Sequence, residues 1–282
     1  MPLQSMVPML KRAQAEGYAV GLFDVHSLEG TLAVIEAAAE QLSPAVIAPF
    51  FAPRRAMAAL IRELAAGVPV PIAIELDHGR DLQSVMECID AGFTDVMIDA
   101  STVSYEENVA LTRQVVEAAH AAGLGVEAEL GHVGRGENYA DLTARRGAFT
   151  RPKDAQRFVA QTGVDVLAVA VGSAHGMYKG QPELDLDLLD RIRERVEVPL
   201  VLHGGSGLSD EDWQAAIRHG VSKVNIYTDM ALAAVRAMEE SLTGEAAETG
   251  KPTYIQVQRA AHEAIKKVVV HCMQVFGSAG RI

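Results

Sequence analysis

The feature of this sequence that most limits its fold is a regular alternation of strand-like and helix-like segments. Each strand-like run is followed by apolar residues at helical spacing, as over 28–42 and 104–123. Buried strands that alternate with helices are typical of α/β proteins with a parallel sheet. The predicted strands are 18–24, 44–50, 71–79, 94–100, 124–130, 164–172, 198–207 and 221–226.

Eight such β/α pairs account for nearly the whole chain of 282 residues, without a linker or a low-complexity segment. That length suits one closed barrel. We therefore predict an α/β fold, a (β/α)8 TIM barrel in which residues 1–282 form a single domain. A C-terminal helical extension follows the last strand, with a break near 248–254. The alternative is an open doubly wound sheet, which the lack of a glycine-rich dinucleotide turn after the first strand disfavours.

Charge and hydropathy limit the partners of the chain. Its formal net charge of −12 argues against nucleic acid or an anionic membrane as the main partner. No apolar run approaches the roughly 18 residues of a membrane span, and the N-terminus lacks the pattern of a secretory signal. Cys88 and Cys272 fit no metal or redox motif, so we expect free thiols. We predict a cytoplasmic protein that acts on a small molecule.

Polar residues gather at the carboxyl ends of the predicted strands, which meet at one mouth of a barrel. His78, His175 and His203 follow the third, sixth and seventh strands. Three imidazoles around one open coordination position are the ligand set of a catalytic zinc ion. The strand ends carry, in chain order, Asp24 and His26, Asp77 and His78, Asp99, Glu127 and Glu129, His175, His203, and Asn225.

The two carboxylates of the fifth predicted strand lie on the same side of that strand. Glu127 and Glu129 alternate with apolar residues, so both point into the barrel. Near a metal they would orient ligands, hold a second cation or tune a proton acceptor. The alternative for Glu127 is a buried ion pair with Lys223, which also points inward by strand period.

Two glycine-rich turns, 175–179 and 203–207, follow neighbouring strands. Glycine lets backbone N–H groups approach an anion, and Lys179 and Ser206 add further donors. Asn225 and Thr228 at the eighth strand would complete a phosphate cradle, a common feature of barrels near strands seven and eight. The polar loop 131–150 is long enough to be a lid.

These motifs together resemble the class II, zinc-dependent ketose-bisphosphate aldolases, which include the fructose- and tagatose-bisphosphate enzymes. The tagatose-type subgroup is the most similar. The resemblance covers nearly the whole chain and is carried by LDHG (76–79), VMIDAS (96–101), VEAELG (126–131), HGMYK (175–179), LHGGSG (202–207), KVNIYTD (223–229) and GSAGRI (277–282).

The resemblance implies cleavage or formation of a carbon–carbon bond in a ketose (bis)phosphate. The products are dihydroxyacetone phosphate and an aldehyde, through a zinc-stabilised enediolate, in a homodimer or homotetramer. It also allows for a monovalent cation, Na⁺ or K⁺, near Lys179. The implied roles are zinc binding by His78, His175 and His203, a second shell or alternative metal position at Glu129 and Asp99, acid/base catalysis by Asp77, proton transfer at carbon by Glu137, and substrate binding by Gly176, Lys179, Gly204, Ser206, Asn225 and Thr228.

The sequence departs from the family at the aldehyde side. Many members have FNxxN after the first strand, where this chain has 23–26 FDVH. The fructose enzymes have a serine after the second strand, where 49–53 reads PFFAP, and a basic DPR-like segment is replaced by 250–253 GKPT. We therefore expect an aldehyde other than glyceraldehyde 3-phosphate, unphosphorylated or differently charged.

Two other functions stay open on the sequence alone. Metal-dependent hydrolases of the same fold usually carry a His-x-His pair at the first strand, where His26 stands alone here. A non-catalytic accessory subunit of an aldolase is the second alternative, and the complete His, Asp and Glu set speaks against it.

Overall fold

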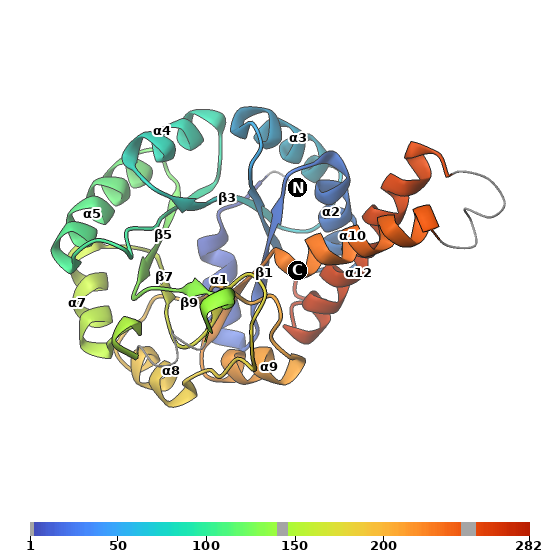
Figure 1. The fold of residues 1–282 in the computed structure, drawn as a ribbon. Helices are drawn as coiled ribbons and strands as arrows, with labels where there is room; N and C mark the ends of the chain where they lie inside the picture. The colour runs from blue at the N-terminus through green and yellow to red at the C-terminus, as the bar shows by residue number, and fades with distance from the viewer. Residues whose placement is uncertain (1–2, 140–145, 244–251) are drawn as a thin grey trace.

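Eight parallel strands close into a barrel in the order β1-β10-β9-β7-β5-β4-β3-β2 (Figure 1). The structure, a computed structural model, describes residues 3–139, 146–243 and 252–282. The predicted (β/α)8 fold is thereby confirmed. Part of the predicted loop 131–150 lies outside the described residues, as do 248–251 of the predicted break, which include Gly250 and Lys251.

Each barrel strand overlaps a predicted run, and only β1 extends beyond its run, by Val25. The strands are β1 Val20–Val25, β2 Ala45–Pro49, β3 Ile72–Gly79, β4 Asp95–Ile98, β5 Gly125–Leu130, β7 Val166–Val169, β9 Leu200–Leu202 and β10 Val221–Ile226. The helices around them are α2 Leu28–Gln41, α3 Arg54–Ala66, α4 Leu82–Ala91, α5 Tyr105–Ala121, α7 Pro152–Thr162, α8 Leu186–Arg193 and α9 Asp210–Arg218. Local signals set their ends: Ser209 caps α9 in a reciprocal capping box with Asp212.

A helix that the sequence analysis did not predict, α1 Met6–Glu16, closes the amino-terminal mouth of the barrel (Figure 1). Its buried side chains, among them Met6 and Leu10, form one apolar cluster with residues of the barrel interior such as Leu22. Asp95 at the start of β4 anchors this helix by accepting a hydrogen bond from the Met6 N–H at 2.9 Å. The closed mouth leaves the carboxyl-terminal mouth for a site.

At that other mouth, two short strands join the loops after β5 and β7. β6 Gly134–Arg135 pairs in parallel with β8 Ala174–His175. The short helices η1 Gly136–Asn138 and η2 Arg146–Ala148 belong to the first of these loops. The Lys179 N–H donates to the Gly136 carbonyl at 3.0 Å. A Cβ at Gly136 would come within 2.5 Å of the Met177 carbonyl, so only glycine permits this approach.

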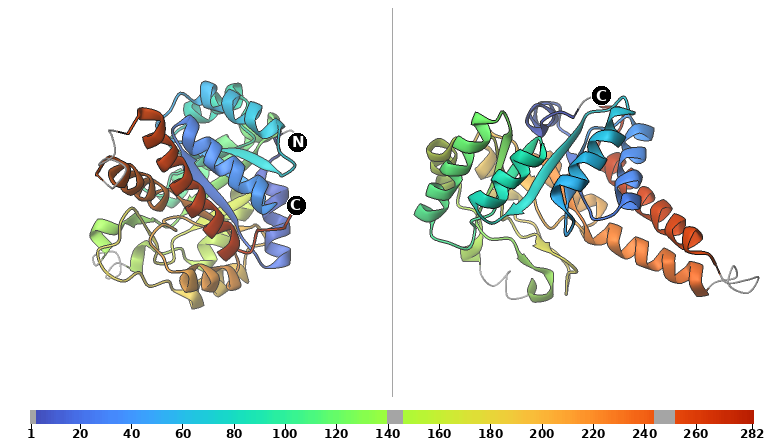
Figure 2. Two further views of the ribbon diagram at one scale, coloured as in Figure 1. Left: turned by 90° about the vertical axis from the view of Figure 1, so that its right-hand side faces the viewer. Right: turned by 90° about the horizontal axis from the view of Figure 1, so that it is seen from above.

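Two helices, α10 Thr228–Thr243 and α12 Tyr254–Val275, follow the last strand and pack on each other. They extend from the side of the barrel as an arm, most clearly in the right-hand view of Figure 2. The chain then returns to the barrel, where the Ser43 hydroxyl donates to the Ser278 hydroxyl at 2.8 Å. Among the described residues, none of the helices has the length and apolarity that a membrane crossing requires.

Candidate active site

The three histidines predicted to bind metal come together at the carboxyl-terminal mouth. His78 Nε2 lies 3.2 Å from His175 Nε2 and 3.2 Å from His203 Nδ1. A tetrahedral zinc ion bound to two imidazole nitrogens at about 2.05 Å separates them by about 3.3 Å. The ring nitrogens therefore already have the spacing that one such ion requires.

Carboxylates fix the orientation of two of these rings. His78 Nδ1–H donates to Asp99 Oδ2 at 2.8 Å, and His203 Nε2–H donates to Glu127 Oε1 at 2.9 Å. Each bond uses one ring nitrogen as the donor and turns the other to the common centre, as in known metal sites. His78, the penultimate residue of β3, has φ 47°, a left-handed conformation that is costly outside glycine and is often found at functional sites.

The carboxylates around His78 favour a positive charge at that residue. Burial alone would lower the pKa of His78, but Asp77 and Asp99 outweigh it and raise that pKa to about 10. Burial, with the other two histidines, lowers the pKa of His175 to about 3. Glu129 Oε2 is buried and has no hydrogen-bond partner among the described residues. Two groups of residues thus offer donor atoms that fit a divalent cation. The first group is His78, His175 and His203, and the second is His78, Asp99 and Glu129.

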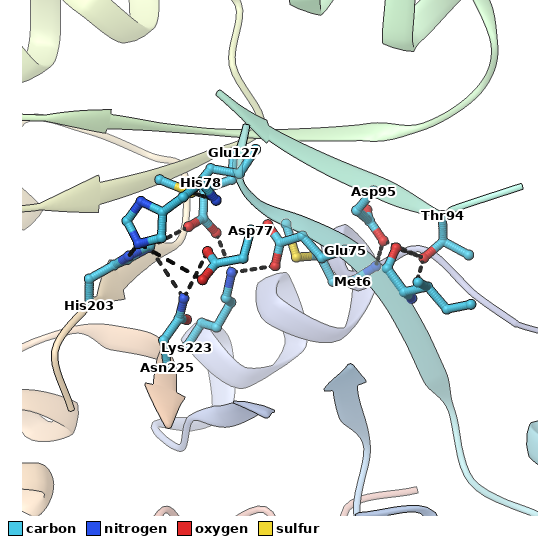
Figure 3. A network of polar contacts seen from close by, with 12 residues as sticks. Met6, Glu75, Asp77, His78, Thr94, Asp95, Glu127, His203, Lys223 and Asn225 are labelled. Carbon is cyan, nitrogen blue, oxygen red and sulfur yellow. Dashed lines mark hydrogen bonds and ion pairs between the residues drawn. The ribbon is translucent and has the colours of Figure 1, made fainter. Parts of the chain in front are cut away.

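Glu127 also belongs to a charged network inside the barrel, which confirms the alternative interpretation of this residue (Figure 3). Lys223 Nζ lies 2.6 Å from Glu127 Oε2 and 2.5 Å from Glu75 Oε2, and all three side chains are fully buried. The pair with Lys223 and the bond to His203 coexist, since each uses a different oxygen of Glu127. Glu75 was not among the predicted site residues, although it lies two residues before Asp77 and so faces the same side of β3.

Asp77, the predicted acid/base residue, is held in its ionised form. Asn225 Nδ2 donates to Asp77 Oδ1 at 3.2 Å. Burial by itself would raise the pKa of Asp77, but His78 and His203 more than compensate and lower it. The carboxylate can therefore accept a proton from a substrate hydroxyl.

The glycine turn 204–207 meets the start of α10. The Ser206 hydroxyl accepts hydrogen bonds from the N–H groups of Tyr227 at 3.1 Å and Asp229 at 3.3 Å, which leaves its own hydrogen to be donated. Gly204 has φ 65°, and a Cβ there would meet the Ala174 carbonyl at 2.4 Å. The close packing of this turn on β8, beside a helix N-terminus, is a geometry that suits an anion.

A cavity of about 550 Å³ joins these elements. It is lined by most of the predicted site residues and by others to which the sequence assigned no catalytic or binding role. The predicted lining residues are Asp77, His78, Asp99, Glu137, His175, Gly176, His203, Gly204, Ser206, Asn225 and Thr228. The additional ones include Asp24, Phe50, Phe51, Arg80, His132, Arg135 and Tyr227.

Two predicted residues are not among those that line the cavity. Lys179 is exposed, and its backbone rather than its side chain is engaged, with Gly136. Glu129 lies below the cavity floor, with Oε1 accepting from the Val133 N–H at 3.1 Å. Asn225 contacts Asp77 and His203 rather than Ser206. Sequence spacing alone did not distinguish these positions, because several strand ends share one mouth.

Comparison with known proteins agrees with this geometry. Residues 4–281 match the family described as "Fructose-bisphosphate aldolase class-II". The chain is 41% identical over 289 residues to the "Probable fructose-bisphosphate aldolase" of Bacillus subtilis (strain 168), with 100% of both chains covered. It is 33% identical to the YdjI aldolase from Escherichia coli K12, whose crystal structure superposes with a TM-score of 0.87 over 99% of each chain. The chain belongs to the class II fructose-bisphosphate aldolase family.

Proposed function

We propose that this metal-dependent aldolase cleaves and forms a carbon–carbon bond in a ketose phosphate, with dihydroxyacetone phosphate and an aldehyde as its products. The observation that carries the proposal is the convergence of three imidazoles, with His78 Nε2 3.2 Å from a ring nitrogen of each of the other two, in a cavity that also contains a carboxylate and a glycine-rich turn. Family membership favours this activity over a hydrolase or an accessory subunit.

Zn²⁺ is the metal that we propose for the site. Three imidazole ligands and one open position are the donor set of catalytic zinc. His78, His175 and His203 would hold it, while Asp99 and Glu129, with His78, would form a second shell or an alternative position. When bound, the ion polarises the ketone and stabilises the negative charge that cleavage leaves on the ketose fragment.

Protein groups would move the protons. Asp77 would accept the hydroxyl proton of the carbon that becomes the aldehyde, held in place by the Asn225 amide. Glu137, which is exposed on η1 and lines the cavity, would return a proton to the carbon next to the ketone. Its place on a loop over the site suits a group that approaches after substrate binds.

The phosphate next to the ketone would lie against the turn after β9. Ser206 would donate its hydroxyl hydrogen, and Gly176, Gly204 and Thr228 would surround the anion. The start of α10 adds the positive end of a helix dipole. Lys179 would contribute from its exposed position, and a Na⁺ or K⁺ ion near it would help to hold the phosphate. Asn225 would contact the substrate from the Asp77 side.

The part of the cavity that would hold the aldehyde differs from this phosphate cradle. We propose that the enzyme does not take glyceraldehyde 3-phosphate. Asp24, Phe50 and Phe51 line the cavity where family members carry Asn and Ser. Thr253 caps α12 through Gln256 instead of offering a basic segment to a distant phosphate.

We also propose a homodimer or homotetramer in the cytoplasm. The arm of α10 and α12 supports assembly with a second copy, because it exposes large apolar side chains: Val235 50%, Leu242 55%, Tyr254 75% and Ile255 61%. Sedimentation at equilibrium tests this assembly, and a monomer at micromolar concentration would contradict it.

One assay tests the proposed reaction. The purified protein is analysed for bound metal and incubated with ketose 1-phosphates and bisphosphates, and dihydroxyacetone phosphate is followed through its reduction by NADH with a coupling dehydrogenase. We expect zinc at the site and a release that a chelator stops. Inorganic phosphate without dihydroxyacetone phosphate would indicate a hydrolase, and absence of both metal and turnover would indicate an accessory subunit.

A further inference from the structure

Two oxygen atoms at neighbouring strand ends are buried in the cavity wall without a hydrogen-bond partner among the described residues. They are Asp24 Oδ1 on β1 and Asn225 Oδ1 on β10. An unpaired buried oxygen costs free energy, so native proteins rarely keep one unless a ligand satisfies it. Two of them on one cavity surface therefore indicate a ligand that brings hydrogen-bond donors.

The strand register places both residues on the side of Asp77. β1 and β10 are adjacent, with Leu22 opposite Asn225, and Asp24 lies two residues further on the same face of β1. The Asn225 side-chain N–H donates to Asp77, which fixes the orientation of the amide. The amide oxygen, Oδ1, is an acceptor and therefore needs a donor from a ligand. The charge of Asp77 also acts on Asp24 and, after burial, is the second cause that raises its pKa well above the usual range. These groups meet the part of the substrate that becomes the aldehyde.

Aromatic rings form the adjoining wall of the cavity. Phe50 lies 4.1 Å from Phe51 and 5.4 Å from Tyr227 between ring centroids, and all three line the cavity. Phe51 is 89% exposed and has φ 50°, a costly conformation that presents its ring at the mouth. Aromatic faces pack against C–H groups, and carboxyl or amide oxygens pair with hydroxyls. The combination suits a polyhydroxylated carbon chain.

Given the aldolase reaction proposed above, on which this inference rests, we propose that Asp24 is a specificity-determining residue. Its carboxyl group hydrogen-bonds a hydroxyl of the aldehyde, and the enzyme takes a neutral polyhydroxy aldehyde in preference to a phosphorylated one. A hydroxyl both donates and accepts, so it satisfies Asp24 in either protonation state and also Asn225 Oδ1. A phosphate dianion only accepts, and it would face the Asp77 carboxylate and an amide oxygen that offers it nothing.

The cavity also contains two arginines, Arg80 and Arg135, which define the competing outcome. Both are exposed and lie at the ends of β3 and β6 rather than beside β1. If either one binds a second phosphate, the phosphorylated aldehyde is the better substrate. The experiment must therefore compare aldehydes that differ in the phosphate alone.

The test uses the condensation direction, which does not depend on the stereochemistry of the new bond. Metal-loaded enzyme is mixed with dihydroxyacetone phosphate and either glyceraldehyde or glyceraldehyde 3-phosphate, and consumption of dihydroxyacetone phosphate gives kcat/KM for each aldehyde. The variant is Asp24→Ala, and Asp24→Ser serves if the first does not fold. Asp90→Asn, which removes a carboxylate exposed on α4, is the matched control.

We expect the wild-type enzyme and the control to prefer glyceraldehyde. Loss of a hydrogen bond to a buried carboxyl group should lower the ratio of the two kcat/KM values by about tenfold or more in the Asp24 variant. A wild-type preference for the phosphorylated aldehyde, or an unchanged ratio in the folded variant, would overturn the assignment of Asp24 while leaving the aldolase reaction intact. If the wild-type enzyme consumes dihydroxyacetone phosphate with neither aldehyde, the proposed reaction itself fails.

Discussion

Replacement of Lys223 by methionine tests whether the charged network under the histidines holds the barrel together. The Lys223 ammonium lies 2.5 Å from Glu75 and 2.6 Å from Glu127, with no solvent access to any of the three. Lys223→Met keeps the length of the side chain but leaves two carboxylates without their counter-ion. Removal of one partner from a buried ion pair costs about 3–5 kcal/mol of stability. For a chain of this size we therefore expect the melting temperature to fall by roughly 10 °C.

The pH dependence separates this cause from a packing defect. Without Lys223, burial and mutual repulsion would raise the pKa values of both glutamates in the folded protein above those in the unfolded chain. Groups with raised folded pKa values stabilise the fold when protonated, and that stability is lost as the pH rises through those values. The deficit of Lys223→Met against wild type should thus be largest near pH 8 and shrink toward pH 5.

The assay is thermal and urea unfolding of metal-free protein across that pH range, with Lys153→Met, an exposed lysine on α7, as the control. The control should stay within about 0.5 kcal/mol of wild type. A loss below about 1 kcal/mol at neutral pH would mean that the carboxylates do not depend on Lys223, contrary to the buried-pair argument. A large but pH-independent loss would point to packing instead of charge.

Four further predictions concern the site and the barrel floor. His203→Ala should lose bound metal and activity but keep the barrel folded by circular dichroism; retained metal would remove His203 from the ligand set. Asp77→Ala should keep the metal and lose about 10²–10⁴-fold in cleavage rate, and an unchanged rate would reassign the acid/base role. Glu127→Gln should weaken metal binding about 10–100-fold in a chelator competition, unless Glu127 serves Lys223 alone. Burial outweighs the hydrogen bonds that Asp95 accepts and raises its pKa to about 6, so its protonated form stabilises the fold and that stability is lost as the pH rises through about 6. Urea unfolding of Asp95→Asn should lack that loss between pH 5 and pH 7.5, and equal pH slopes in the two proteins would contradict it.

The strand ends show how much of the site could be predicted from the sequence. His78 and His203 end buried strands, and strand ends at one mouth of a barrel must converge. His175 was predicted by the same rule, yet it lies in β8, a short strand of a second sheet that only the pairing with β6 creates. No local pattern predicts that pairing, because two-residue strands have no periodicity to detect.

The sequence predicted which way the strand side chains point, but it did not predict which residues they contact. Strand period put Glu127 and Lys223 inside the barrel, but it left open whether Glu127 serves the metal histidines or the lysine, and the structure has it do both. Asp24 and Asn225 face the same cavity, and only the arrangement of hydrogen bonds around them left one oxygen of each without a partner.

The sequence by itself determined the βα alternation, the inward faces of the strands and the mouth at which the polar residues gather, since these follow from local periodicity and burial. The tertiary structure decided the plug by α1, the second small sheet, the spacing of the imidazole nitrogens and which acceptor atoms stay unpaired. Those features depend on atoms far apart in the chain meeting within a few ångströms, and a pattern of neighbouring residues does not record such distances.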